Sequence, residues 1–104
     1  KKILSNKICD NNLPFVPEWT NPSWHLFVIR TKNRDKLKIY LEKLGIKTLI
    51  HYPIPPHKQK AFSEFNNLSF PITEQIHSEV LSIPLYSLLS EEQEKYIVNA
   101  LNAY

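Results

Sequence analysis

The densest group of chemically versatile side chains in this chain lies in the sequence HYPIPPHKQ, which begins at His51. These side chains can exchange hydrogen bonds with sugar hydroxyls or with a phosphate. The prolines among them restrict the backbone, so less conformational entropy is lost when the side chains are held in place. The stretch is therefore a candidate binding loop, and the alternative is a surface turn that serves no ligand. Its other polar members are Tyr52, His57, Lys58 and Gln59.

Other kinds of chemistry find less support in the sequence. His51 and His57 lie in one segment, but no cysteine or carboxylate stands at ligand spacing beside them, so we expect no metal site. A serine nucleophile elbow needs flanking glycines, and the chain has a single glycine, Gly45. The same shortage excludes a glycine-rich phosphate-binding loop. Hydrogen bonding to a ligand thus remains the chemistry that this stretch favours.

Composition indicates one soluble globular domain, since 104 residues contain 42% hydrophobic and 22% charged residues. The net charge of +3 is spread over lysines interleaved with glutamates, which does not predict a nucleic-acid-binding protein. No apolar run approaches the roughly 18 residues of a membrane span. The single cysteine, Cys9, cannot form an internal disulfide, and a cytoplasmic location is the expectation.

The elements that must position the loop begin with a predicted strand over residues 24–30, rich in aromatic and β-branched residues. A helix should follow, with Asn33 as its N-cap and Gly45 just after its end. A second strand is predicted over 46–52, and it must end before Pro53, which donates no backbone hydrogen bond. The apolar residues of the helix recur with helical spacing at Leu37, Tyr40, Leu41 and Leu44.

The rest of the chain alternates between short helices and a strand. We predict helices over 58–65 and 72–79, and a short strand over 80–83. Ser90 and Gln93 have the spacing of a capping box, which predicts that the final helix begins there. This order of elements describes a small α+β or α/β unit.

The candidate loop lies in GIKTLIHYPIPPHKQ, residues 45–59, which resembles the GI.T..HYP.P.H.Q motif of the DegT/DnrJ/EryC1/StrS aminotransferases. These are sugar-nucleotide aminotransferases of the aspartate aminotransferase fold. Further likeness lies in HLFVIR at 25–30, before the Arg-Asp start of a helix, and in FPITE at 70–74 with LSIPL at 81–85, which resemble FP..E and LSLPL. The resemblance covers residues 24–104.

The fold that this resemblance implies is α+β, the small C-terminal domain of the aspartate aminotransferase (type I PLP) fold. It has a short, mostly antiparallel sheet with helices packed on one side. We expect this domain to occupy residues 24–104. Residues 1–23 would then be the tail of a helix, over 1–9, and a proline- and asparagine-rich connector from a large domain that the sequence does not include.

The activity that the resemblance implies belongs to a longer parent enzyme. Such an enzyme uses pyridoxal 5'-phosphate (PLP) to transfer an amino group, usually from glutamate, to a nucleotide-linked keto-deoxysugar, for surface polysaccharide or related amino-sugar biosynthesis. It is a homodimer with active sites at the subunit interface. The large domain holds PLP through a Schiff-base lysine.

The lysine motif of the family, a Ser/Thr-Lys step before a glycine-rich turn, cannot be placed in this chain. Thr31-Lys32 is followed by Asn33-Arg34, without glycine. The chain also lacks methionine, even at its first position. We therefore expect a fragment that is inactive alone and that carries no catalytic and no cofactor-binding residue.

The site residues that the resemblance implies are substrate-binding groups. Tyr52 and His57 would line the mouth of the active site toward the sugar nucleotide. His51 would contact substrate or brace the loop, and Gln59 would hold the loop or reach the substrate. Two alternatives to the enzyme remain open: a non-catalytic module that binds a nucleotide sugar or a partner protein, and a regulatory homologue that binds PLP.

Overall fold

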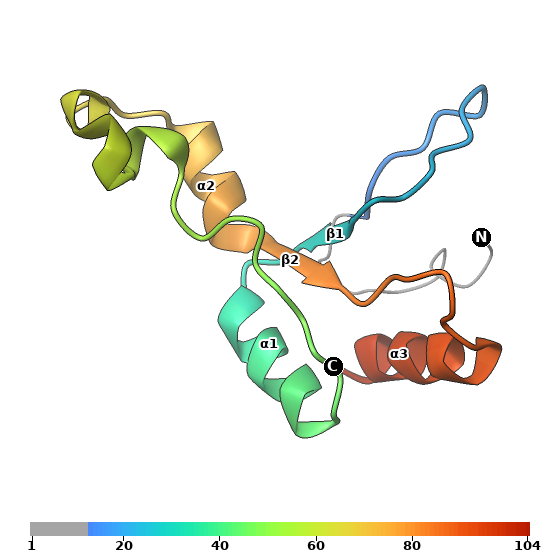
Figure 1. Ribbon diagram of the computed structural model, residues 1–104. Coiled ribbons are helices and arrows are strands. Elements are labelled where there is room, and N and C mark those ends of the chain that lie inside the picture. The colour runs from blue at the N-terminus through green and yellow to red at the C-terminus, as the bar shows by residue number, and fades with distance from the viewer. Residues whose placement is uncertain (1–12) are drawn as a thin grey trace.

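The computed structural model of this chain describes residues 13–104. The predicted helix tail over 1–9, with Cys9, lies outside these residues. The elements follow one another as β1 (Phe27–Arg30), α1 (Arg34–Lys43), two 3₁₀ helices η2 (Pro56–Lys58) and η3 (Lys60–Phe65), α2 (Pro71–Glu79), β2 (Val80–Ile83) and α3 (Glu91–Ala103), as Figure 1 shows. Residues 13–26 contain no helix or strand.

The sheet consists of β1 and β2, which pair antiparallel. Ile29 lies opposite Leu81 and Phe27 opposite Ile83, so the four side chains share one face of the sheet. β1 is shorter than predicted, because Trp24 has a positive φ of 49° and the chain becomes extended only at Phe27.

The prediction of a strand over residues 46–52 is wrong. Only Leu49 pairs there, through an isolated bridge to Ser82 with hydrogen bonds of 3.1 and 2.7 Å. The start of the segment is tied to α1 instead, because the N–H of Ile46 donates to the carbonyl of Leu41. Pro53 then follows within a few residues and ends any ladder. The segment therefore crosses the sheet edge with a single paired residue.

α1 begins and ends where the sequence predicts. Asn33 precedes its first turn, but the Asn33 side chain makes no capping hydrogen bond. Gly45 has a φ of 75°, and its N–H donates to the carbonyl of Glu42, so the chain leaves the helix in the left-handed conformation that glycine tolerates. Leu37 and Leu41 are fully buried.

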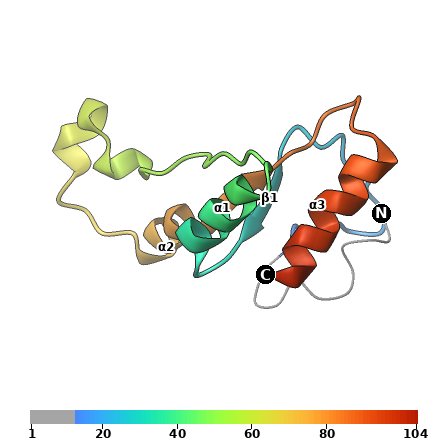
Figure 2. The same ribbon diagram turned by 90° about the horizontal axis from the view of Figure 1, so that it is seen from below.

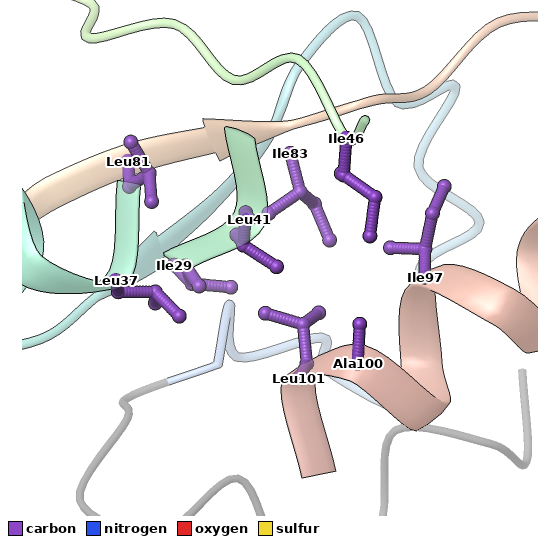
Figure 3. Close-up of a cluster of buried hydrophobic side chains, with 9 residues drawn as sticks. All are labelled: Ile29, Leu37, Leu41, Ile46, Leu81, Ile83, Ile97, Ala100 and Leu101. Carbon is purple, nitrogen blue, oxygen red and sulfur yellow. The ribbon is translucent and has the colours of Figure 1, made fainter. Parts of the chain in front are cut away.

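The core lies between the sheet and two helices, α1 and α3. Both helices lie below the strands in Figure 1, and in Figure 2, which is seen from below, α1 lies across the strands and α3 beside them. This arrangement matches the expected α+β fold with helices packed on one side of a short antiparallel sheet. Figure 3 shows the side chains that meet there: Ile29, Leu37, Leu41, Ile46, Leu81, Ile83, Ile97, Ala100 and Leu101.

α3 confirms the predicted capping box. Ser90 Oγ accepts a hydrogen bond from the backbone N–H of Gln93, and Gln93 Oε1 accepts one from the backbone N–H of Ser90. Ile97 and Leu101 then face the core, while Tyr104 stays half exposed. Within residues 13–104, no helix is long and apolar enough to cross a membrane.

The segment from Pro56 to Phe70, here called the arm, stands away from α1 and α3 in both Figure 1 and Figure 2. The single helix predicted over 58–65 is replaced by η2 and η3, because Gln59 between them is extended, with φ −77° and ψ 149°. Lys58 Nζ donates to two backbone carbonyls of the arm, at 2.8 and 3.0 Å. The arm is therefore folded on itself rather than on the core.

Candidate functional site

The candidate site is the segment Tyr52–His57, here called the proline loop, which leads from the Leu49 bridge into the arm and shares Pro56 and His57 with it. α2 holds this loop at both ends. The carbonyl of Tyr52 accepts a hydrogen bond from His77 Nδ1 at 2.6 Å. At the other end, His57 Nε2 lies 2.9 Å from Glu74 Oε1. The loop is thus anchored to a helix at the residue where it begins and at the residue where it ends.

Tyr52 presents the free side chain of the loop. The residue is 64% exposed, and its ring lies edge-on to the ring of His51, with the ring centres 5.5 Å apart. Its hydroxyl makes no hydrogen bond within residues 13–104. Because a phenol can both donate and accept, this hydroxyl is available to a ligand that carries sugar hydroxyls or a diphosphate.

His57, predicted to line the mouth of a substrate site, is buried against α2. Its side chain is 7% exposed, and the space around its ring is occupied by Glu74 and by the ring of Phe70, which stands edge-on at 4.9 Å. The hydrogen bond from His57, with a second from the backbone N–H of Phe70, lowers the pKa of the Glu74 carboxyl below its ordinary value. His57 therefore joins the loop to α2.

His51 and Gln59 also make contacts within the chain. The Nδ1 of His51 lies 2.8 Å from the hydroxyl of Ser82 on β2, which ties the start of the loop to the sheet. Gln59 Nε2 donates to the carbonyl of Ile54 across the loop, at 3.2 Å. Of the alternatives that the sequence left open for these two residues, the structure places both in bracing positions.

Sequence reasoning did not assign a role to Glu74 or His77. Both lie in the helix predicted over 72–79, and Glu74 belongs to the FPITE motif. Residues three apart on a helix share one face, so the spacing of Glu74 and His77 was a signal that both reach the same neighbour. What the spacing could not show is that the neighbour is the proline loop.

Two hollows lie elsewhere on the described part of the chain. One of about 810 Å³ lies among the connector, β2 and α3, and one of about 600 Å³ lies between Gly45 and the start of α3. Neither is lined by the four predicted site residues.

A PLP cofactor does not fit the described residues. None of the lysines in residues 13–104 is buried, and Lys58, which adjoins the loop, has its ammonium group occupied by the carbonyls of Asn66 and Leu68. Within the same residues no three His, Cys, Asp or Glu side chains lie close enough to hold a metal ion. Among residues 13–104 there is thus neither a buried lysine nor a cluster of metal-ligating side chains.

An antiparallel strand pair with helices on one face, and a proline-locked loop at its edge, form a small α+β unit, and solved aminotransferase structures contain a similar unit. The chain belongs to the DegT/DnrJ/EryC1/StrS aminotransferase family, whose sequence profile matches residues 3–102. The family, and the fold that the resemblance implied, are therefore confirmed.

Individual relatives agree with this assignment. The dTDP-3-amino-3,6-dideoxy-alpha-D-galactopyranose transaminase of Aneurinibacillus thermoaerophilus is 53% identical over 89% of this chain and 26% of its own length. The crystal structure of DesV from S. venezuelae, in complex with a ketimine intermediate, superposes with a TM-score of 0.88 at 34% identity, over 97% of this chain and 28% of DesV. The structure of NtdA from Bacillus subtilis with bound PMP superposes with a TM-score of 0.76 at 31% identity, over 88% of this chain and 22% of NtdA. The chain thus spans about a quarter of the length of these relatives.

Proposed function

We propose that this chain is the C-terminal small domain, residues 24–104, of a PLP-dependent aminotransferase that acts on a nucleotide-linked keto-deoxysugar. The name of the A. thermoaerophilus relative, a dTDP-aminosugar transaminase at 53% identity, supports the substrate class. The ketimine and PMP in two similar structures support the cofactor. Because the chain spans about a quarter of these relatives, the amino transfer requires the remainder of the parent protein.

The wider setting follows from the same proposal. The parent holds PLP in its large domain, since the lysines of residues 13–104 are not buried. It takes the amino group from glutamate and works as a cytoplasmic homodimer. Its product serves surface polysaccharide or related amino-sugar biosynthesis. Residues 1–23 connect the large domain to this one.

Within this domain, Tyr52 is the proposed substrate contact. The observation that carries this assignment is the exposure of Tyr52, whose hydroxyl lacks a partner within residues 13–104, while the polar side chains of His57 in the loop and of His51 beside it are engaged. The hydroxyl would donate to a sugar hydroxyl or to the diphosphate of the sugar nucleotide. His51, His57 and Gln59 support the loop from which Tyr52 projects.

The test uses the intact parent protein with Tyr52→Phe, which removes only the hydroxyl. A lost hydrogen bond of about 0.5–1.5 kcal/mol, or about 1.5–3 kcal/mol to a charged diphosphate, predicts a rise in KM for the sugar nucleotide of about 2- to 150-fold. Conversion of the cofactor to PMP by glutamate alone should keep its rate. Tyr104→Phe, at another half-exposed tyrosine, is the matched control. An unchanged KM in Tyr52→Phe contradicts the contact.

A further inference from the structure

Two side chains of α2 reach the proline loop from one face of the helix. Glu74 and His77 are three residues apart, which places them on the same side of α2. Glu74 meets the end of the loop at His57, and His77 meets its beginning at Tyr52. The two contacts together bracket the only stretch of the loop that carries an unengaged polar side chain.

The contact at His77 acts on the backbone of Tyr52. A carbonyl oxygen can only accept, so His77 carries a proton on Nδ1 and donates it over 2.6 Å. His77 is itself held, because Arg34 Nη1 at the start of α1 donates to the His77 carbonyl at 3.3 Å. The backbone at Tyr52, from which the ring projects, is thus held by α2 directly and by α1 through His77.

The contact at Glu74 fixes the far end. One carboxylate oxygen of Glu74 accepts from His57 Nε2 at 2.9 Å and from the N–H of Phe70 at 3.1 Å. The Phe70 ring then packs edge-on against His57. Between the two anchors stand Pro53, Ile54, Pro55 and Pro56, and each proline has a nearly fixed φ. A loop with fixed ends and three prolines has few conformations left.

We propose that Glu74 and His77 are positioning residues, which set the place of the Tyr52 hydroxyl at the sugar-nucleotide site without touching the substrate. This inference rests on the proposed function of Tyr52. Displacement of a substrate-positioning group by about 1 Å can lower a rate by about 100-fold. Loss of either anchor should therefore lower kcat/KM for the sugar nucleotide by about 10- to 100-fold and leave the reaction with glutamate alone unchanged.

The first experiment compares three variants of His77 in the intact parent protein. His77→Ala removes the donor and should lower kcat/KM for the sugar nucleotide about 10-fold or more. His77→Asn places an amide N–H near the position of the imidazole Nδ1, so it should restore most of that loss. His77→Gln places its amide near Nε2 and should not. Rescue by Gln instead of Asn would mean that Nε2 acts directly on the substrate, and it would overturn the proposal.

A double-mutant cycle tests whether His77 acts through Tyr52. In a Tyr52→Ala background, His77→Ala should cause no further loss of kcat/KM for the sugar nucleotide, because no tyrosine ring remains to be positioned. Additive losses overturn the proposal. At the other anchor, Glu74→Gln keeps an oxygen that accepts from Phe70 and His57, so its kcat/KM for the sugar nucleotide should stay close to that of the unmodified protein. Glu74→Ala should lower kcat/KM as much as His77→Ala does. Equal losses in Gln and Ala would contradict a positioning role for the oxygen.

A readout besides activity separates this inference from the proposed function. Released anchors should speed tryptic cleavage after Lys58 and Lys60 in the arm of the intact protein, in both alanine variants. Unchanged cleavage and unchanged kinetics in these variants, beside an impaired Tyr52→Phe, overturn the positioning role and leave the proposed function standing. An unimpaired Tyr52→Phe overturns the proposed role of Tyr52 as a substrate contact, whatever the two α2 variants do.

Discussion

Two buried threonines offer a matched pair for testing how unpaired polar groups affect the stability of this domain. Thr48 is 8% exposed, and its hydroxyl has no hydrogen-bond partner within the described residues. Thr31 is 6% exposed, and its hydroxyl accepts from the backbone N–H of Asn33 at 3.3 Å. We predict that Thr48→Val stabilises the chain, whereas Thr31→Val does not.

The magnitude follows from the state of each hydroxyl. A buried hydroxyl without a partner costs about 1–3 kcal/mol in proteins, and valine keeps the branched shape of threonine while removing that group. Thr48→Val should therefore raise the free energy of unfolding by about 1–3 kcal/mol. Thr31→Val loses a formed hydrogen bond, worth about 0.5–1.5 kcal/mol, and should lower the free energy of unfolding by up to that amount.

Urea unfolding of the purified chain measures the difference. Trp24 packs against Phe27 with ring centres 5.0 Å apart, so its fluorescence reports on the sheet. With a urea dependence of about 2 kcal/mol per molar, the midpoint of Thr48→Val should rise by about 0.5–1.5 M, at an unchanged slope. A midpoint for Thr48→Val at or below that of the unmodified chain would refute the reasoning, because the hydroxyl would then have a stabilising partner.

Three further outcomes are expected from the same unfolding assay. Gly45→Ala should cost about 1 kcal/mol through its φ of 75° alone, since an added Cβ would meet nothing within 4 Å; Gly45→Asn should cost less, and equal costs would point to packing instead. Ser90→Ala should cost about 1 kcal/mol by removing the cap of α3, and Ser90→Asp should restore most of it. The hydrogen bonds from Gln75 and Arg30 lower the pKa of Glu79 below 4.5, so the ionised carboxylate stabilises the fold above pH 4.5, and this stabilisation disappears as the pH falls through the lower folded pKa. Glu79→Gln should remove this part of the acid sensitivity, and an unchanged dependence of the unfolding free energy on pH would contradict it.

Local signals were enough to predict several elements of this fold. The end of α1 at Gly45 and the capping box of Ser90 and Gln93 depend on residues within a few positions of one another. β2, over Val80–Ile83, follows from a short apolar run that ends at Pro84. Each of these signals acts through the backbone of its own segment, so the sequence alone carries it.

The misplaced elements depend on partners far along the chain. A strand over 46–52 was expected from β-branched residues, yet the sheet offers that segment only Ser82, so one residue pairs. The burial of His57 depends on Glu74, 17 residues away, and on the Phe70 ring that α2 brings with it. Strand propensity and residue spacing do not predict contacts between residues this far apart in the sequence. The loop could be located from its motif, while the burial and the hydrogen-bond partners of its side chains could not be predicted.

The passage from α2 to β2 has no connecting residue, because α2 ends at Glu79 and β2 starts at Val80, already extended with a φ of −71° and a ψ of 137°. Figure 1 shows the helix running straight into the strand. A single residue inserted at this joint would either turn the side chains of β2 to the opposite face or, with β2 held in register, swing the Glu74 side of the helix by about 100°. The arm stands away from α1 and α3, whereas this joint fixes the length of the chain between the proline loop and the core.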